Sequence, residues 1–507
     1  MRSVYLKPSP THFLQINVKI PEGKEMEIKI NERLLEEKLK DVQKGRSWRV
    51  NAIAKLEELI RTSDDYSLFR VNPLKFGEEN GISEQESIDV FLYATKAGLF
   101  EMNWQLLCPG CGDVVESFNT LRNLDSHYHC SLCQKDFEAA LDDYIEVSFT
   151  IDPRTREIVF NNPQYLSIED YFFKYVFSHG AVYADGTKSV DVIQKLLKIL
   201  TYLEPGEKKE FEIEISAGYL VGYDRINHAE FLFNVTGELK PGIQHFSSKL
   251  LDGEYFPAKD ELSPGRYVFG LENQTKKRGA ILLIHEPTDY SAPGPLRYRP
   301  FLTGKRLLTT QTFRDFFRSE VIQETEGIGV KDITILFTDL KESTALYDDI
   351  GDLKAFALVR QHFDSLGKVI NVHSGAIVKT IGDAIMATFL NPFDAVKAAL
   401  GMINEMERFN LGFSGKDIKL KVGIHKGSSV AVTLNDRLDY FGQTVNISSR
   451  VQKLADADEI YVSHDVYNYP GVRELLKDLE VTLGKANLKG VQGEIQIYKI
   501  KKTVVVS

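Results

Sequence analysis

The chain has 507 residues, enough for about three or four domains at roughly 150 residues each. Hydrophobic residues make up 43% and charged residues 26% of the sequence, and the net charge of -10 argues against nucleic acid or an anionic membrane as the main partner. No apolar run reaches the roughly 18 residues that cross a bilayer, and the first residues lack the apolar core of a signal peptide. We therefore expect a cytoplasmic protein without a membrane span.

Helix-forming residues dominate the first part of the chain, residues 1–105. Apolar side chains recur every three or four residues in segments 32–45 and 51–62, which predicts amphipathic helices. Residues 72–102 combine a short helix, a turn and a second helix, with Ser83 as its cap and Glu86 three residues later. This rhythm resembles winged-helix modules, which often bind DNA, but the second helix carries few basic residues. We expect a winged-helix-like module with a structural or protein-interaction role.

All four cysteines lie within residues 106–140. Cys108 and Cys111 form one C-x2-C pair, and Cys130 and Cys133 form a second after eighteen intervening residues. Two such pairs present four thiolates, the ligand set of a structural Zn2+ ion, at a spacing typical of zinc ribbons. A redox-active pair and a chance pattern are the alternatives to this predicted zinc ribbon.

Residues 141–298 change to strand patterns. Segments such as 210–216 and 229–239 alternate or run apolar between turns, which predicts a β-rich, sandwich-like domain. Helix is expected to be mixed in at 141–151 and 193–203. The region holds no combination of residues that indicates chemistry, so we expect a regulatory or scaffolding role that responds to an unknown ligand or protein.

Proline and glycine gather at residues 291–300 and mark a boundary. Residues 299–327 then predict a linker helix, in which Phe313, Phe316, Phe317 and Val321 share one stripe. Three explanations fit the stripe: pairing with a second copy of the helix, packing on the next domain, or ordinary core packing.

The order of elements is clearest in residues 328–502. Strands are expected at 333–340, 376–382, 383–390, 418–425 and 459–463, and helices at 355–375, 392–409 and 444–457. This βαββαβ order predicts a ferredoxin-like antiparallel sheet with helices on one face, in an α+β multidomain chain. Asp339 ends an apolar strand and Asp383 follows Gly382 in a hairpin. The two carboxylates together suit Mg2+, although each by itself is typical of turn chemistry.

Four motifs of this region occur in a fixed order, namely FTDLKEST, VKTIGDAIMATF, VGIHKG and LDYFGQTVNISSR. In order and spacing they resemble the catalytic domain of class III nucleotidyl cyclases, over about residues 331–500, a third of the chain. The resemblance implies that Asp339 and Asp383, with the carbonyl of Leu340, bind two Mg2+ or Mn2+ ions. It also implies that Lys379 and Asp439 select the base.

The physical chemistry of the base agrees with that assignment. A lysine donates to N1 of adenine and an aspartate accepts from its amine, whereas guanine reverses both groups. Polar groups left unpaired lower affinity by about 10⁴ in favourable sites, so Lys379 and Asp439 predict ATP rather than GTP.

The remaining positions imply the conversion of ATP to cyclic AMP and pyrophosphate. By resemblance, Asn446 orients the ribose, Arg450 stabilises charge on the α-phosphate, and Lys489 contacts the terminal phosphates. Sites of the family form between two catalytic domains. The single domain of this chain carries both sets of residues, which predicts a homodimer with two interfacial active sites.

Two departures from the family pattern are present, Ser448–Ser449 and Lys426, and neither removes a named role. The alternatives to an adenylate cyclase are a cyclase for another nucleotide such as GTP, and a zinc-ribbon binding protein whose cyclase domain is degenerate. Degenerate domains lose a metal aspartate or the Asn/Arg pair, and all of these positions are filled here.

Overall fold

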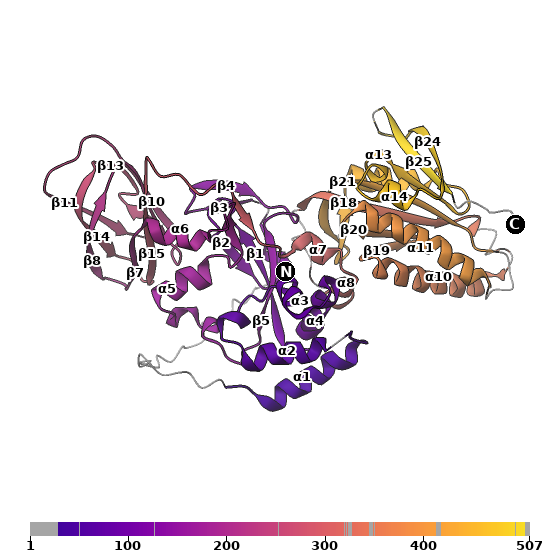
Figure 1. Cartoon of the computed structure of the whole chain (residues 1–507), viewed down its shortest axis with the longest axis horizontal. Helices are drawn as coiled ribbons and strands as arrows, with labels where there is room; N and C mark the ends of the chain where they lie inside the picture. The colour runs from indigo at the N-terminus through magenta and orange to yellow at the C-terminus, as the bar shows by residue number, and fades with distance from the viewer. Residues whose placement is uncertain are drawn as a thin grey trace, which may run out of the picture.

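The computed structural model describes residues 29–49, 51–125, 127–251, 253–318, 320, 322, 327–343, 348, 350–411, 417–491 and 493–501. Figure 1 shows an N-terminal part made of helices and several sheets, a C-terminal part built on one large sheet, and short helices between them. No helix in these ranges is long and apolar enough to cross a membrane. Residues 1–28 of the expected first module, and Val321, lie outside them.

Four helices begin the described part of the chain: α1 (Glu32–Gly45), α2 (Ala52–Thr62), α3 (Pro73–Asn80) and α4 (Glu84–Lys96). The Ser83 hydroxyl accepts a hydrogen bond from the Glu86 N–H at the start of α4, as the capping pattern predicts. Leu35, Leu39 and Val42 of α1 are buried together. The apolar stripes of the sequence therefore place these helices on a common core.

A four-stranded sheet joins segments that the sequence analysis placed in different modules. Its order is β17-β5-β1-β2, with bounds β1 (Phe100–Leu107), β2 (Val114–Phe118), β5 (Ile145–Ile151) and β17 (Leu302–Thr303). The helix expected within 141–151 is wrong, because Val147 pairs with Trp104 on one side and Leu302 on the other. The expected boundaries near residues 105, 140 and 299 therefore cut through one sheet and one continuous core.

Two further sheets face each other across a second core, which is the arrangement of a β-sandwich. One has the order β13-β10-β9-β15-β7 and the other β12-β11-β14-β8. Their strands are β7 (Leu197–Leu203), β8 (Lys208–Ile215), β9 (Gly218–Asp224), β10 (Ala229–Val235), β11 (Ile243–Leu250), β12 (Tyr255–Phe256), β13 (Lys259–Leu262), β14 (Gly265–Asn273) and β15 (Gly279–Pro287). Gly222 of β9 leaves room for the ring of Phe231, its pairing partner on β10 in the same sheet, because a Cβ there would lie 1.9 Å from that ring.

Short elements connect these layers. They are β3 (His127–Cys130), β4 (Lys135–Glu138), α5 (Ile168–Asp170), β6 (Ala181–Tyr183), α6 (Ser189–Leu196) and β16 (Leu296–Tyr298). The helix expected at 193–203 is therefore only partly present, since α6 ends at Leu196 and strand β7 follows directly.

The segment expected as one linker helix, residues 299–327, instead contains β17 and two short helices, α7 (Gly304–Leu308) and α8 (Gln311–Phe316). Thr303 lies directly before α7 and Thr310 directly before α8, both in extended conformation, so the segment forms two short helices and not the one long helix expected. Phe313 is fully buried against Trp104, and Phe316 packs edge-on to Tyr93 with 4.6 Å between ring centroids. Phe313 thus packs on the N-terminal part as a core residue, whereas Phe316 and Phe317 are half-buried.

One large sheet forms the C-terminal part, with the order β19-β20-β18-β21-β23-β25-β24 and β22 paired to β21. Its strands are β18 (Ile328–Leu340), β19 (Ala376–Ile381), β20 (Ala384–Phe389), β21 (Leu420–Leu434), β22 (Arg437–Phe441), β23 (Glu459–Ser463), β24 (Glu480–Asn487) and β25 (Glu494–Lys501). Its helices are α10 (Asp352–Val372), α11 (Pro392–Leu411), α12 (Gln443–Gln452), α13 (His464–Tyr467) and α14 (Val472–Leu475). All pairs are antiparallel except β21 with β23.

Strand β18 shows how the two faces of this sheet differ. Leu336 lies in the core beneath α10 and α11, whereas Ile335 and Phe337 lie in the core that continues into the N-terminal part. Val445 of α12 packs against the same core as Ile335 and Phe337. The prediction of helices on one face is therefore wrong, because the position of α12 depends on long-range packing that its own sequence does not reveal.

Candidate active site

Two carboxylates meet at one end of neighbouring strands. Asp339 is the penultimate residue of β18, and Asp383 lies in the turn between β19 and β20. Phe337 pairs with Met386, and the Ile385 N–H donates a hydrogen bond to the Thr338 hydroxyl. Continuing this register brings Asp339 beside the turn that holds Asp383. Both side chains are partly exposed, whereas the side chain of the following Leu340 is buried beneath the helices.

The two carboxylates have different electrostatic surroundings. Lys421 faces Asp339 directly across β18 and β21 and forms an ion pair with it. The Oδ2 atom of Asp383 is buried and accepts no hydrogen bond within the described part of the chain. An unpartnered buried carboxylate oxygen is costly, so Asp339 and Asp383 fit Mg2+ or Mn2+. Sequence reasoning missed Lys421, although it interrupts an apolar strand at the position that pairs with Asp339.

A buried histidine lies near this site. His362 of α10 has no exposed surface, its Nδ1 lies 3.0 Å from the Val359 carbonyl, and its Nε2 has no partner among the described residues. Burial lowers the pKa of His362 below 6.5, with the Val359 carbonyl and Asp383 acting in the opposite direction. Burial therefore favours the neutral imidazole in the folded state.

Acid should destabilise the metal-free protein through His362. Below pH 6.5 the unfolded chain binds a proton at this residue more readily than the native state does. The free energy of unfolding therefore decreases as the pH is lowered. Urea unfolding between pH 8 and pH 5 should show a smaller decrease for His362→Leu than for the wild type. His245→Leu, at an exposed position of the β-sandwich, is the control and should retain the wild-type decrease. An equal decrease in His362→Leu and wild type would exclude this role.

Lys379 and Asp439 form an ion pair although they lie 60 residues apart in the sequence. The Lys379 ammonium of β19 is 2.5 Å from Oδ2 of Asp439 on β22, and the other carboxylate oxygen accepts from the Tyr440 N–H at 2.8 Å. Asp439 is 5% exposed, while Lys379 is partly exposed. The tertiary structure thus joins the two residues that the sequence analysis assigned to base recognition.

Helix α12 presents Asn446 and Arg450 one turn apart. Asn446 is exposed, and the Arg450 guanidinium lies against Gly490 in the loop after β24, where a Cβ would come within 3.5 Å of it. Lys489 is the preceding residue in that loop and is exposed. The structure therefore brings Arg450 and the Lys489 loop together.

The two departures from the family pattern have structural partners. Ser448 is fully buried and its hydroxyl donates to the Ile335 carbonyl of β18 at 2.7 Å, which fastens α12 to the sheet. Lys426 pairs with Asp332 at 3.1 Å and lies over the Tyr469 ring.

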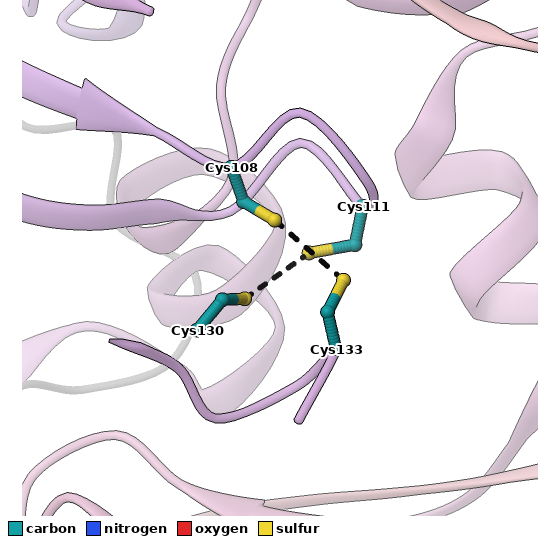
Figure 2. A group of neighbouring side chains, drawn as sticks. All are labelled: Cys108, Cys111, Cys130 and Cys133. Carbon is teal, nitrogen blue, oxygen red and sulfur yellow. Dashed lines mark hydrogen bonds between the residues drawn. The ribbon is translucent and has the colours of Figure 1, made fainter. Parts of the chain in front are cut away.

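The four cysteines converge on one point from two turns (Figure 2). Their sulfur atoms all lie within 4.8 Å of one another, and three of the four residues are buried. The neighbouring thiols, Cys108 first, and burial raise the pKa of Cys111 well above its ordinary value. Four close sulfur atoms form a suitable ligand set for one metal ion of the size and softness of Zn2+.

Two family models match the chain. A family of unknown function, DUF5939, covers residues 36–315, more than half of the sequence. The adenylate and guanylate cyclase catalytic domain covers residues 328–502.

Two curated relatives each match about a third of the chain or less. An adenylate cyclase from Anabaena cylindrica is 29% identical over 193 residues, 35% of this chain and 38% of that protein. The soluble guanylate cyclase gcy-31 from Caenorhabditis elegans is 26% identical over 147 residues, 27% of this chain and 21% of that protein. The chain thus spans well under half the length of either relative.

A solved structure, the adenylyl cyclase CyaB from P. aeruginosa, is 24% identical, with a TM-score of 0.31, and the match covers 35% of this chain and 97% of that one. The family match confirms the cyclase resemblance of the sequence motifs. The chain belongs to the DUF5939 family, and its residues 328–502 form a class III nucleotide cyclase catalytic domain.

Proposed function

We propose that this protein is an adenylate cyclase that converts ATP to 3′,5′-cyclic AMP and pyrophosphate, under the control of its N-terminal region. The observation that carries the proposal is the contact between Lys379 and Asp439, 2.5 Å apart in the sheet that also holds the two metal-binding carboxylates.

The choice of ATP rests on hydrogen-bond polarity, since both adenylate and guanylate cyclases are among the relatives. An ammonium donates and a carboxylate accepts, which matches N1 and the amine of adenine. Guanine would place its N1–H against Lys379 and its carbonyl oxygen against Asp439. A GTP cyclase is the second candidate, and the relatives alone do not separate the two.

The reaction would join the ribose 3′-oxygen to the α-phosphorus, with the hydroxyl proton released to solvent, while the bond from that phosphorus to pyrophosphate breaks. Asp339, Asp383 and the Leu340 carbonyl would hold Mg2+ or Mn2+, which acidifies the 3′-hydroxyl and neutralises the triphosphate. Asn446 would orient the ribose for in-line attack, and Arg450 would stabilise charge on the α-phosphoryl group through its rigid fork of donors. Lys489 would hold the departing phosphates.

The catalytic unit would be a homodimer with two equivalent sites. One subunit would supply the metal-binding carboxylates, and the other would supply the base, ribose and phosphate contacts. The exposure of Asn446 on α12 supports this arrangement, because its side chain is available to a nucleotide held by a second chain. A monomer is expected to be inactive.

Product analysis tests the proposal. Purified protein is incubated with Mg2+ or Mn2+ and ATP, GTP, CTP or UTP, and the products are identified by mass. Cyclic AMP should be the main product from the wild type and should be lost in Asp339→Ala. The absence of cyclic AMP, or an equal yield from Asp339→Ala, would refute the proposal, and preferential formation of cyclic GMP would favour the second candidate.

Exchanging the base-reading pair should change the substrate preference. In Lys379→Glu with Asp439→Cys, the carboxylate can accept from guanine N1–H, while the donor for adenine N1 is gone. The ratio of kcat/KM for ATP over GTP is expected to fall at least about a hundredfold. Unchanged selectivity in this variant would overturn the assignment of both residues.

The four cysteines are proposed to hold one structural Zn2+ ion in the cytoplasmic protein. Cys130→Ser removes one thiolate and should greatly weaken zinc binding, because the fourth position of the tetrahedral site is left to water or to the weaker serine hydroxyl. The free energy of unfolding should fall by several kcal/mol, and a strong chelator should destabilise the wild type but not the variant. Metal analysis and thermal unfolding measure both effects.

Ser131→Ala changes the same turn without removing a ligand and is the control for the zinc site. It should bind as much metal as the wild type. A wild type with much less than one zinc per chain would contradict the assignment.

A further inference from the structure

Helix α8 lies between the N-terminal part and the strands that carry Lys379 and Asp439. Figure 1 shows it at the junction of the two parts. On one side, Phe313 contacts Trp104 of β1 and Phe316 contacts Tyr93 of α4. Its other side reaches β19 and β22, as the polar contacts of α8 show.

Arg314 of α8 holds the strand that bears Asp439. Its Nη1 donates to the Leu438 carbonyl at 3.1 Å, and its Nε donates to the Leu308 carbonyl at the end of α7 at 2.8 Å. The guanidinium carbon lies 5.5 Å from the centre of the Tyr440 ring. Arg314 therefore contacts the residues immediately before and after Asp439.

Gln311 makes a corresponding contact with the strand that bears Lys379. Its side-chain oxygen accepts from the Ile377 N–H at 2.8 Å, and its amide nitrogen donates to Asp315 at 2.9 Å. Ile377 is two residues before Lys379, at an irregularity in the pairing of β19 with β20. The backbone N–H at this irregularity takes its partner from α8 rather than from the sheet.

We propose that Arg314 and Gln311 are positioning residues for base recognition, so that α8 sets the separation of Lys379 and Asp439 and thereby the preference for ATP. This inference rests on the proposed function, because it assigns a controlling element to the same site. The N-terminal part acts through α8, since any displacement of α4 or β1 against Phe313 and Phe316 would displace the two polar contacts as well.

The packing around α8 leaves space for such a displacement. A cavity of about 250 Å³ lies beside Gln311, with Arg46 and Tyr93 from the N-terminal helices and Asn371 from α10 in its walls. A helix next to an open volume can shift with less loss of packing than one enclosed on every side. Because hydrogen bonds weaken steeply with distance and angle, a small shift at β19 or β22 would alter the fit to adenine.

The test compares steady-state kinetics with ATP and GTP for the full-length wild type, Arg314→Ala, Arg314→Lys and Gln311→Ala. The ratio of kcat/KM for ATP over GTP should fall about tenfold in Arg314→Ala, mainly through the KM for ATP, and less in Gln311→Ala. Arg314→Lys should recover part of the preference, because a lysine keeps the charge but cannot donate to both carbonyls in the fixed geometry of a guanidinium. Thermal unfolding of each variant is measured alongside the kinetics, to check that the variant is folded.

Lys75→Ala is the matched control. It removes an exposed cation of α3 that pairs with Glu79 of the same helix, and it should leave the nucleotide preference unchanged. A wild type that makes no cyclic AMP would refute the proposed function itself. This inference alone would be refuted if the wild type prefers ATP and Arg314→Ala and Gln311→Ala keep the same preference. It would also be refuted if these variants lower kcat equally for both nucleotides.

Discussion

Asp383→Asn should lower kcat about a thousandfold, because the site would lose the charge of one of the two carboxylates that we propose bind metal, an effect of about 4 kcal/mol on the barrier. Asparagine has nearly the same size as aspartate, so the turn between β19 and β20 should remain intact. The Oδ2 atom of Asp383 is buried without a hydrogen-bond donor in the described structure. Removing this uncompensated charge should leave the midpoint of thermal unfolding unchanged or slightly raised. Cyclic AMP formation with saturating Mg2+ and Mn2+ measures the effect.

Asp332→Asn provides the comparison for this substitution. Asp332 belongs to the same strand as Asp339, but it is about half exposed and pairs with Lys426 at 3.1 Å. This variant should keep the wild-type kcat. If Asp383→Asn retained activity within about threefold of the wild type, the carboxylate would have no part in metal-dependent catalysis.

A heterodimer of two inactive variants should regain about half of the wild-type activity per dimer, because one of its two interfacial sites is intact. Asp339→Ala removes a metal ligand, and Arg450→Ala removes the stabilising cation. If each site takes Asp339 from one subunit and Arg450 from the other, the mixed dimer places both lesions in one site. The two variants are co-expressed with different tags, purified sequentially on both tags and assayed for cyclic AMP.

The two homodimeric variants are the reference for that experiment and should each show less than about one per cent of wild-type activity. A doubly mutated chain mixed with wild type gives the second comparison, since its heterodimer has one lesion in each site and should be inactive. Activity in that heterodimer, purified on both tags, together with none in the first heterodimer would place both residues of each site in a single subunit.

Several features could be predicted from the sequence, because they depend on short segments. The spacing of the C-x2-C pairs identified the four sulfur atoms that the fold brings within 4.8 Å. The Ser83 cap and the alternating strands follow from local hydrogen bonding and side-chain periodicity. The motifs around Asp339, Asp383 and Asp439 indicated a cyclase domain, which the family match confirms.

Other features could not be predicted from local patterns. Strand β17 pairs with β5, more than 150 residues away in the chain. The expected modules therefore share a sheet that the pattern of no single segment predicts. The face of α12 follows from packing that includes the buried hydrogen bond of Ser448.

The sequence by itself determined which residue types are available for the proposed chemistry: two carboxylates proposed to bind metal, one lysine and one aspartate proposed to contact the base, and an amide and a guanidinium on one helix. Only the tertiary structure decided their neighbours. It placed Lys421 against Asp339, Lys379 against Asp439, and α8 against the strands of that second pair. The physical reason is that strand pairing and core packing join residues far apart in the chain, whereas propensity and periodicity act over a few residues.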